Sequence, residues 1–132
     1  MKGPLVAALI LMVPAAAAAG PAGKWRVADG TAHVQISQCG QALCGSIAWT
    51  DDGGGTDENN PNPAYRKRSL IGLPIMHLQP SGDNLWTGDV YNAKNGQNYS
   101  ARMNLQSETV LRLEGCVPGT NLCGEENWTR VR

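Results

Sequence analysis

Short runs of alternating apolar and polar residues recur along the chain, and turn-forming residues separate them. In residues 31–37, the apolar side chains of Ala32, Val34 and Ile36 share one face. Residues 97–105 repeat the alternation. Because successive side chains of a strand point to opposite faces, this pattern predicts half-buried antiparallel strands.

The same pattern predicts eight strands in chain order. We expect them at residues 24–28, 31–37, 44–50, 74–79, 85–91, 97–105, 109–116 and 125–131. The pair Asn95-Gly96 is a strong hairpin signal. An antiparallel meander of this size closes most easily into an up-and-down barrel, so the predicted fold class is all-β.

One connection is long and polar. Residues 51–62 are rich in Gly, Asp and Asn, which predicts a loop. Residues 63–71 that follow are predicted to form one short helix. Asn62 can cap it, Pro63 suits its first turn and Gly72 can end it.

The first residues do not resemble part of a barrel. Lys2 precedes an apolar run at 5–13, and a small-residue tract follows at 15–19. This order is typical of a cleaved secretory signal peptide. The run is too short to span a bilayer, which takes about 20 residues. We therefore expect residues 1–19 to be removed, leaving 20–132 as a single domain with no stable membrane insertion.

The charge of that mature chain is nearly balanced. Without Lys2, 11 − 1 = 10 basic residues face 11 acidic ones, a formal charge of −1. Such a balance provides no electrostatic attraction to nucleic acid or to an anionic membrane. The chain has no Phe, so its core must be built from aliphatic residues, four Trp and three Tyr.

Four cysteines lie in the mature part, at Cys39, Cys44, Cys116 and Cys123. In an exported protein an even number favours disulfides. Three connectivities are possible, and the local pairs are favoured because each brackets a turn. The alternative is a zinc site, but the spacings are wider than those of typical structural zinc pairs. We therefore expect disulfides and no metal.

Patterns typical of catalysis are mostly missing. His33 lies on the polar face of its predicted strand, and His77 lies in an apolar one. The chain has no nucleophile elbow, no paired-histidine zinc motif and no phosphate-binding loop. The acidic loop 51–60 does not match the spacing of an EF-hand. The sequence thus indicates no catalytic residues and no cofactor.

A polar cluster is the remaining candidate site. It comprises Asp57, Asn60 and Arg68 in the long connection, with Tyr91 and Tyr99 on strands joined by the hairpin turn. Two interpretations stay open. Arg68 and Asp57 could form an ion pair that holds the loop over one barrel end. Alternatively, Arg68 could anchor a ligand carboxylate or phosphate, with the tyrosines supplying hydroxyls.

Several motifs resemble those of one bacterial family. They are Gly23-Lys24-Trp25, Leu43-Cys44-Gly45-x-Ile47, Asp57-x-x-Asn60-Pro61, Arg68-x-Leu70-Ile71-Gly72-Leu73-Pro74, Trp86-x-Gly88, Asn95-Gly96-x-x-Tyr99 and Trp128-Thr129-Arg130-Val131. Together they resemble the uncharacterised family called domain of unknown function 2147. Ala93 departs from the pattern, where many relatives have Pro. The resemblance implies a small exported protein with a lipocalin-like barrel and no established activity.

A second resemblance concerns the two ends of the chain. A Gly-x-Trp motif on the first strand and an arginine on the last are similar to the lipocalin and calycin pattern. That resemblance implies that Trp25 closes one barrel end and that Arg130 stacks over it.

These observations favour a periplasmic or secreted protein that binds a small ligand or an envelope partner without doing chemistry. One alternative is an enzyme that acts on acyl or cell-envelope material through Asp57, Arg68 and Tyr91. The other is an interaction protein with no pocket. An open apolar cavity would favour binding, whereas a packed interior would favour the interaction protein.

Overall fold

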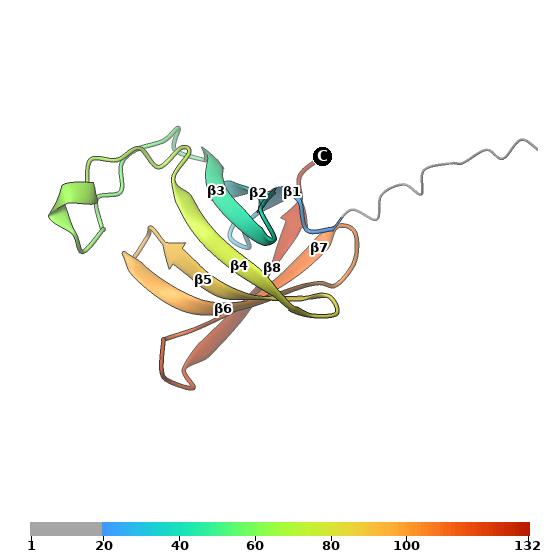
Figure 1. Ribbon diagram of the computed structural model, residues 1–132. Coiled ribbons are helices and arrows are strands. Elements are labelled where there is room, and N and C mark those ends of the chain that lie inside the picture. Colours follow the sequence, from blue (N-terminus) through green and yellow to red (C-terminus); the bar gives the residue numbers. More distant parts are fainter. Residues whose placement is uncertain (1–19) are drawn as a thin grey trace, which may run out of the picture.

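The computed structural model describes residues 20–132, which form a closed antiparallel barrel (Figure 1). Its strands are β1 (Gly23–Arg26), β2 (Ala32–Cys39), β3 (Ala42–Thr50), β4 (Pro74–Gly82), β5 (Leu85–Asn92), β6 (Gln97–Leu105), β7 (Val110–Cys116) and β8 (Cys123–Arg130). Each strand pairs with the next along the chain, and β8 pairs with β1. The predicted eight-stranded up-and-down barrel is confirmed. The predicted signal peptide lies outside the described residues.

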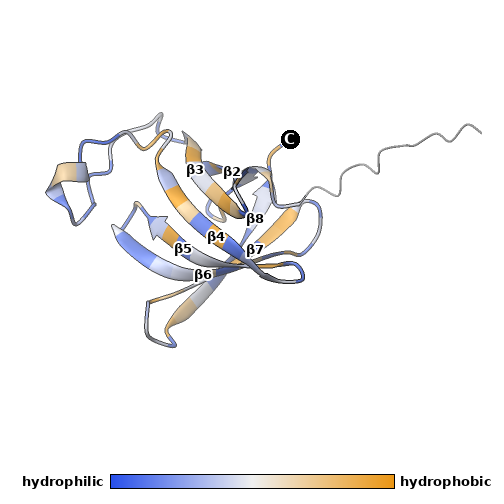
Figure 2. Cartoon of the chain, viewed as in Figure 1, coloured by the Kyte–Doolittle hydropathy of each residue, from blue (hydrophilic) through white to orange (hydrophobic). Residues whose placement is uncertain are grey.

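Apolar side chains at alternate strand positions form the core, and Trp86 and Val90 of β5 pack against it partly buried. Figure 2 shows hydrophobic positions alternating with hydrophilic ones along β4. The core comprises Trp25, Val34, Ile36, Leu43, Met76, Leu78, Ala101, Met103, Leu111, Leu113 and Trp128. Burying these side chains supplies the main stabilisation of the fold, at about 25 cal/mol per Å² of apolar surface.

Closure of the barrel depends on a short contact between the first and last strands. Only two residue pairs join them, Trp25 with Arg130 and Arg26 with Thr129. Trp25 is fully buried, and the Arg130 guanidinium lies 4.3 Å from the centroid of its ring. This is the stacking that the lipocalin resemblance implies.

Trp25 and Arg130 also close one end of the barrel through backbone contacts. The Trp25 indole donates a 2.8 Å hydrogen bond to the carbonyl oxygen of Pro21. Arg130 donates to the carbonyl oxygens of Gly20, Ala22 and Glu108. The N-terminal segment is therefore held across the barrel end, which we call the closed end.

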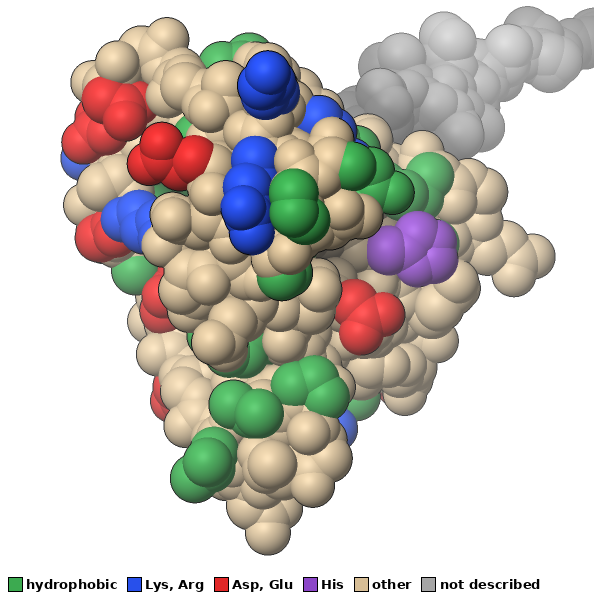
Figure 3. All heavy atoms as spheres, turned by 90° about the vertical axis from the view of Figure 1, so that its left-hand side faces the viewer, with side chains coloured by type: hydrophobic (Ala, Val, Ile, Leu, Met, Phe, Trp, Pro, Cys, Tyr) green, Lys and Arg blue, Asp and Glu red, His purple; other side chains and the backbone are tan. Residues whose placement is uncertain are grey.

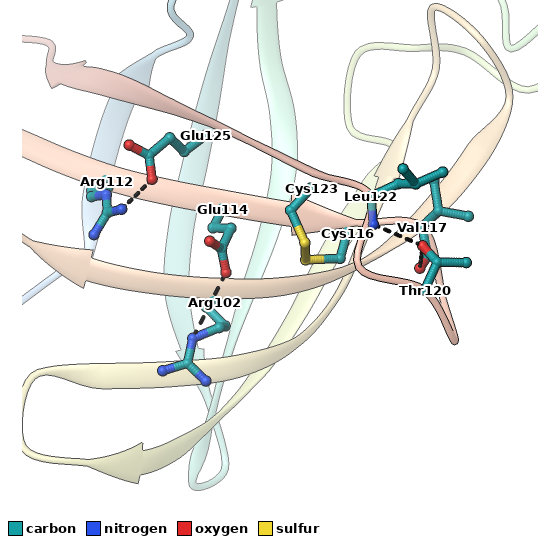
Figure 4. Close-up of a disulfide and its surroundings, with 9 residues drawn as sticks. All are labelled: Arg102, Arg112, Glu114, Cys116, Val117, Thr120, Leu122, Cys123 and Glu125. Atoms are coloured by element: carbon teal, nitrogen blue, oxygen red, sulfur yellow. Dashed lines mark hydrogen bonds and ion pairs between the residues drawn. A yellow bond between two sulfur atoms is a disulfide. The ribbon is translucent and has the colours of Figure 1, made fainter.

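The antiparallel order places the other connections at the opposite, open end. They are the turns between β1 and β2, β5 and β6, and β7 and β8, together with the long segment between β3 and β4. Each end of the barrel has one disulfide. Cys39–Cys44 lies at the closed end, and Cys116–Cys123 lies at the open end, at the base of the β7–β8 hairpin (Figure 4). The structure thus has the local connectivity that the turns favoured.

The prediction of a helix at residues 63–71 is wrong beyond the first turn. Only a 3-10 turn forms, η1 (Pro63–Tyr65), and Asn62 caps it by accepting a hydrogen bond from Ala64 N. After η1 the chain runs back along itself, and Thr56 forms an antiparallel bridge with Ser69. The backbone groups that form this bridge cannot also form the hydrogen bonds of a helix. No helix in residues 20–132 is long and apolar enough to cross a membrane.

Replacing Trp25 with alanine should destabilise the barrel strongly, because it empties the closed end and removes the surface beneath Arg130. Loss of a buried Trp costs about 3–5 kcal/mol of unfolding free energy. Trp49→Ala is the matched control, since its side chain is 42% exposed, and it should cost about 1 kcal/mol. Thermal unfolding followed by circular dichroism compares the two. Equal melting temperatures would show that Trp25 does not support the fold.

Candidate ligand-binding site

The open end of the barrel contains a cavity of about 570 Å³. Its walls are mainly apolar and include Val34, Ile47, Ile75, Val90 and Leu113. Ligand pockets in proteins typically have volumes of about 300–1,000 Å³ and largely apolar walls. The size and lining of this cavity therefore suit a small organic molecule.

Small residues keep this space open. Gly115 on β7 and Gly124 on β8 face each other in the register, and both line the cavity. A Cβ atom added at Gly124 would meet no other atom within 4 Å. At Gly115 an added Cβ would lie 3.4 Å from the Cβ of Tyr99. The missing side chains thus leave room beside the tyrosine.

The segment of residues 51–73 between β3 and β4 lies at the same end, and we call it the lid (Figure 1). Its base is held to β3 by hydrogen bonds from Gly72 N to Ile47 O, at 2.7 Å, and from Ile47 N to Leu73 O, at 3.0 Å. Farther out, Asp57 N donates to Arg68 O at 2.9 Å. The lid is therefore a hairpin-like extension of β3 and β4.

The carboxylate of Asp57 fastens the lid to the barrel. It is fully buried and accepts a 2.7 Å hydrogen bond from the Tyr91 hydroxyl of β5. Asn60 Nδ2 donates to its other oxygen at 2.8 Å, and Arg68 Nη2 lies 3.7 Å from that oxygen. A buried carboxylate is costly unless it is paired and hydrogen-bonded, so these partners define one position of the lid.

A second contact joins the lid to the β5–β6 turn. Asn59 Nδ2 donates to the carbonyl oxygens of Ala93, at 3.3 Å, and Lys94, at 3.0 Å. Gly96 has a φ of 71°, and a Cβ there would collide with the Asn59 carbonyl oxygen. The Asn-Gly turn therefore serves both the hairpin and the close approach of the lid.

The structure divides the polar cluster of the sequence into two groups. Asp57, Asn60 and Arg68 meet within the lid, whereas Tyr91 and Tyr99 line the cavity. The Arg68 side chain is 47% exposed and does not line the cavity. Its guanidinium lies 4.1 Å from the centroid of the Tyr65 ring, so its contacts are with the lid itself.

Tyr91 is positioned as a hydrogen-bond donor. Burial, followed by its hydrogen bond to the Asp57 carboxylate, raises the pKa of Tyr91 to about 12. The hydroxyl consequently stays protonated at neutral pH and donates its hydrogen bond to Asp57. Tyr99 does not reach Asp57, because its hydroxyl accepts a 2.7 Å hydrogen bond from Asn95 Nδ2.

A model of one bacterial family matches residues 23–130 of the chain, nearly all of the described barrel. Its description is "Uncharacterized protein conserved in bacteria (DUF2147)". The chain belongs to this family. The match confirms the family resemblance carried by the sequence motifs, and the DUF2147 assignment itself names no activity.

A solved structure shows a fold similar to that of this DUF2147 protein. It is described as protein HP1028 from the human pathogen Helicobacter pylori, which belongs to the lipocalin family. The two chains are 21% identical, with a TM-score of 0.74 over 84% of this chain and 82% of the other. At this identity the likeness establishes the lipocalin-like fold. No curated protein sequence matches the chain.

One group of metal-ligating side chains lies in the DUF2147 barrel, at the closed end. The donor atoms of Cys39, Cys44 and His77 lie within 4.8 Å of one another. The two sulfur atoms are bonded to each other, however, and a metal site needs thiolates. In the disulfide form this group does not provide a metal centre.

Sequence reasoning missed three residues at the open end: Asn59, Gly124 and Glu126. The contact made by Asn59 joins residues far apart in the chain and leaves no local signal. Glu126 could have been found from the strand alternation, because it lies two residues from the inward-facing Trp128.

Replacing Tyr91 with phenylalanine should loosen the lid without unfolding the barrel, because it removes one of the donors to the buried Asp57 carboxylate. Hydrogen exchange at the amides of residues 55–70 should become faster by about tenfold, since a buried hydrogen bond to a charged group contributes about 1.5–3 kcal/mol. Tyr99→Phe is the control, because the Tyr99 hydroxyl bonds only an exposed asparagine. Equal exchange in both variants would refute the fastening role of Asp57.

Proposed function

We propose that this protein binds a small, largely apolar molecule in the open end of its barrel. The observation that carries the proposal is the cavity of about 570 Å³ with apolar walls. Eight-stranded barrels are just wide enough to hold one small ligand when their interior is not filled by side chains. The lipocalin-like fold is consistent with this use.

The residues of the polar cluster have two roles in this proposal. Tyr91 and Tyr99 lie at the cavity and offer hydroxyl groups to a ligand. Asp57, Asn60 and Arg68 act through the lid, whose position they define, rather than by contact with the ligand. The proposal includes no chemical step.

We further propose that the protein works outside the cytoplasm, in the periplasm or as a secreted protein. Residues 1–19 have the sequence of a signal peptide, and the remaining chain would be a single barrel domain. The two disulfides are compatible with export. An envelope component is therefore a reasonable source of the ligand.

Filling the cavity should abolish binding without loss of stability. Gly124→Phe adds a side chain where the cavity wall is open, so affinity for the neutral apolar dye N-phenyl-1-naphthylamine should fall by about tenfold or more. Asn127→Phe on the outer face of β8 is the matched control and should bind like the wild type. Dye fluorescence measures binding, and thermal unfolding checks the fold. Unchanged binding by Gly124→Phe would show that the dye does not bind in this cavity.

Export predicts a defined mature protein. Mass spectrometry of protein recovered from the exporting host should show a chain that begins at Gly20. Under non-reducing conditions no cysteine should react with an alkylating agent, because all four are in disulfides. A retained Met1 or reactive thiols would contradict the proposed location.

A further inference from the structure

We infer that the cavity selects an organic cation: an apolar body that carries an ammonium group. This inference rests on the proposed function and adds the charge of the ligand. It is based on the carboxylates around the cavity, on the inward-facing position of one of them, Glu126, and on the aromatic rings beside it.

The residues that line the cavity carry a strong excess of negative charge. Six of them are acidic and one is basic, a formal charge of −6 + 1 = −5, and counting Arg112, the ion-pair partner of Glu125, leaves −5 + 1 = −4. The acidic residues are Asp29, Asp51, Asp52, Glu58, Glu125 and Glu126. Acidic side chains also gather on one side of the face that carries the lid (Figure 3). A cavity of one sign of charge with low-dielectric walls attracts counter-ions and repels anions.

The one basic side chain of the cavity is already engaged. Lys94 Nζ lies 2.5 Å from Asp29 Oδ2, across the rim between two turns. This contact, more than any other, lowers the pKa of Asp29 to about 2. Among the other acids, Glu125 pairs on the outer face with Arg112 (Figure 4). A ligand anion would thus find no uncommitted cation in the lining.

Glu126 is an exposed carboxylate whose inward-facing position on β8 puts it in the cavity wall. In the register of β7 and β8 it lies opposite the buried Leu113, and it alternates with the buried Trp128. Its Oε1 accepts a 2.6 Å hydrogen bond from the Trp128 indole nitrogen. Within residues 20–132 no basic side chain lies within 4 Å of the Glu126 carboxylate.

Aromatic side chains complete the arrangement. Trp128, Tyr91 and Tyr99 all line the cavity together with Glu126. A carboxylate next to aromatic rings is the combination that recognises ammonium groups, because the ring faces and the carboxylate both attract positive charge. The apolar walls accept the remainder of the molecule.

The test compares three probes with the same chain and different head groups: decyltrimethylammonium, decanol and decanoate. Each is titrated below its micelle concentration, and binding is followed by calorimetry and by Trp fluorescence. We expect the cation to bind about tenfold more tightly than the alcohol and the carboxylate to bind most weakly. The preference should shrink with added salt, because charge attraction is screened.

Glu126→Gln tests the assigned residue. The amide keeps the size of the side chain and can accept the hydrogen bond from Trp128 but lacks the charge, so cation affinity should fall about tenfold and decanol affinity should not change. Glu114→Gln is the matched control, since it removes an equal charge from the outer face of β7.

The outcomes separate the two levels of the proposal. Equal binding of all three probes to the wild type would overturn the charge preference and leave the cavity as a ligand site. Binding of none of them would overturn the proposed function as well. Cation selectivity that persists unchanged in Glu126→Gln would refute the role of Glu126.

Discussion

Closure of the barrel between β1 and β8 is the constraint on which the other features depend. The contact has two residue pairs, and the fully buried Trp25 beneath Arg130 reinforces it. Because Arg130 also bonds carbonyl oxygens of the N-terminal segment, one end of the barrel is filled and sealed. A rigid closed end lets the opposite end carry small residues and a cavity without loss of the fold.

The two ends therefore have different physical tasks. At the closed end, large apolar side chains supply the burial that stabilises the protein. At the open end, Gly115 and Gly124 occupy inward-facing positions where larger side chains would have packed. The lid lies at this end, and the hydrogen bond between Asp57 and Tyr91 holds it to β5. The cavity and the contact that positions the lid therefore both lie at the open end of the barrel.

The charge around the cavity points away from an anionic ligand anchored by Arg68. The Arg68 guanidinium contacts Asp57 and Tyr65 within the lid, whereas Glu126 lies in the cavity wall. Arg68 is therefore not placed to meet a ligand in the cavity, whereas Glu126 is. Tyr91 is shared by the two regions, because it lines the cavity and bonds Asp57.

The sequence by itself predicted the eight strands and the Asn95-Gly96 turn and favoured the local cysteine pairs among three connectivities, because alternation and turn chemistry act between residues near in the chain. The resemblance to the lipocalin and calycin pattern also led to Trp25 and Arg130. Only the tertiary structure decided that the predicted helix ends after one turn, since Arg68 O and Leu70 N form their hydrogen bonds with Asp57 N and Gly55 O across the lid. It likewise decided which polar residues reach the cavity, because the contact between Asp57 and Tyr91 spans 34 residues and no local pattern encodes it.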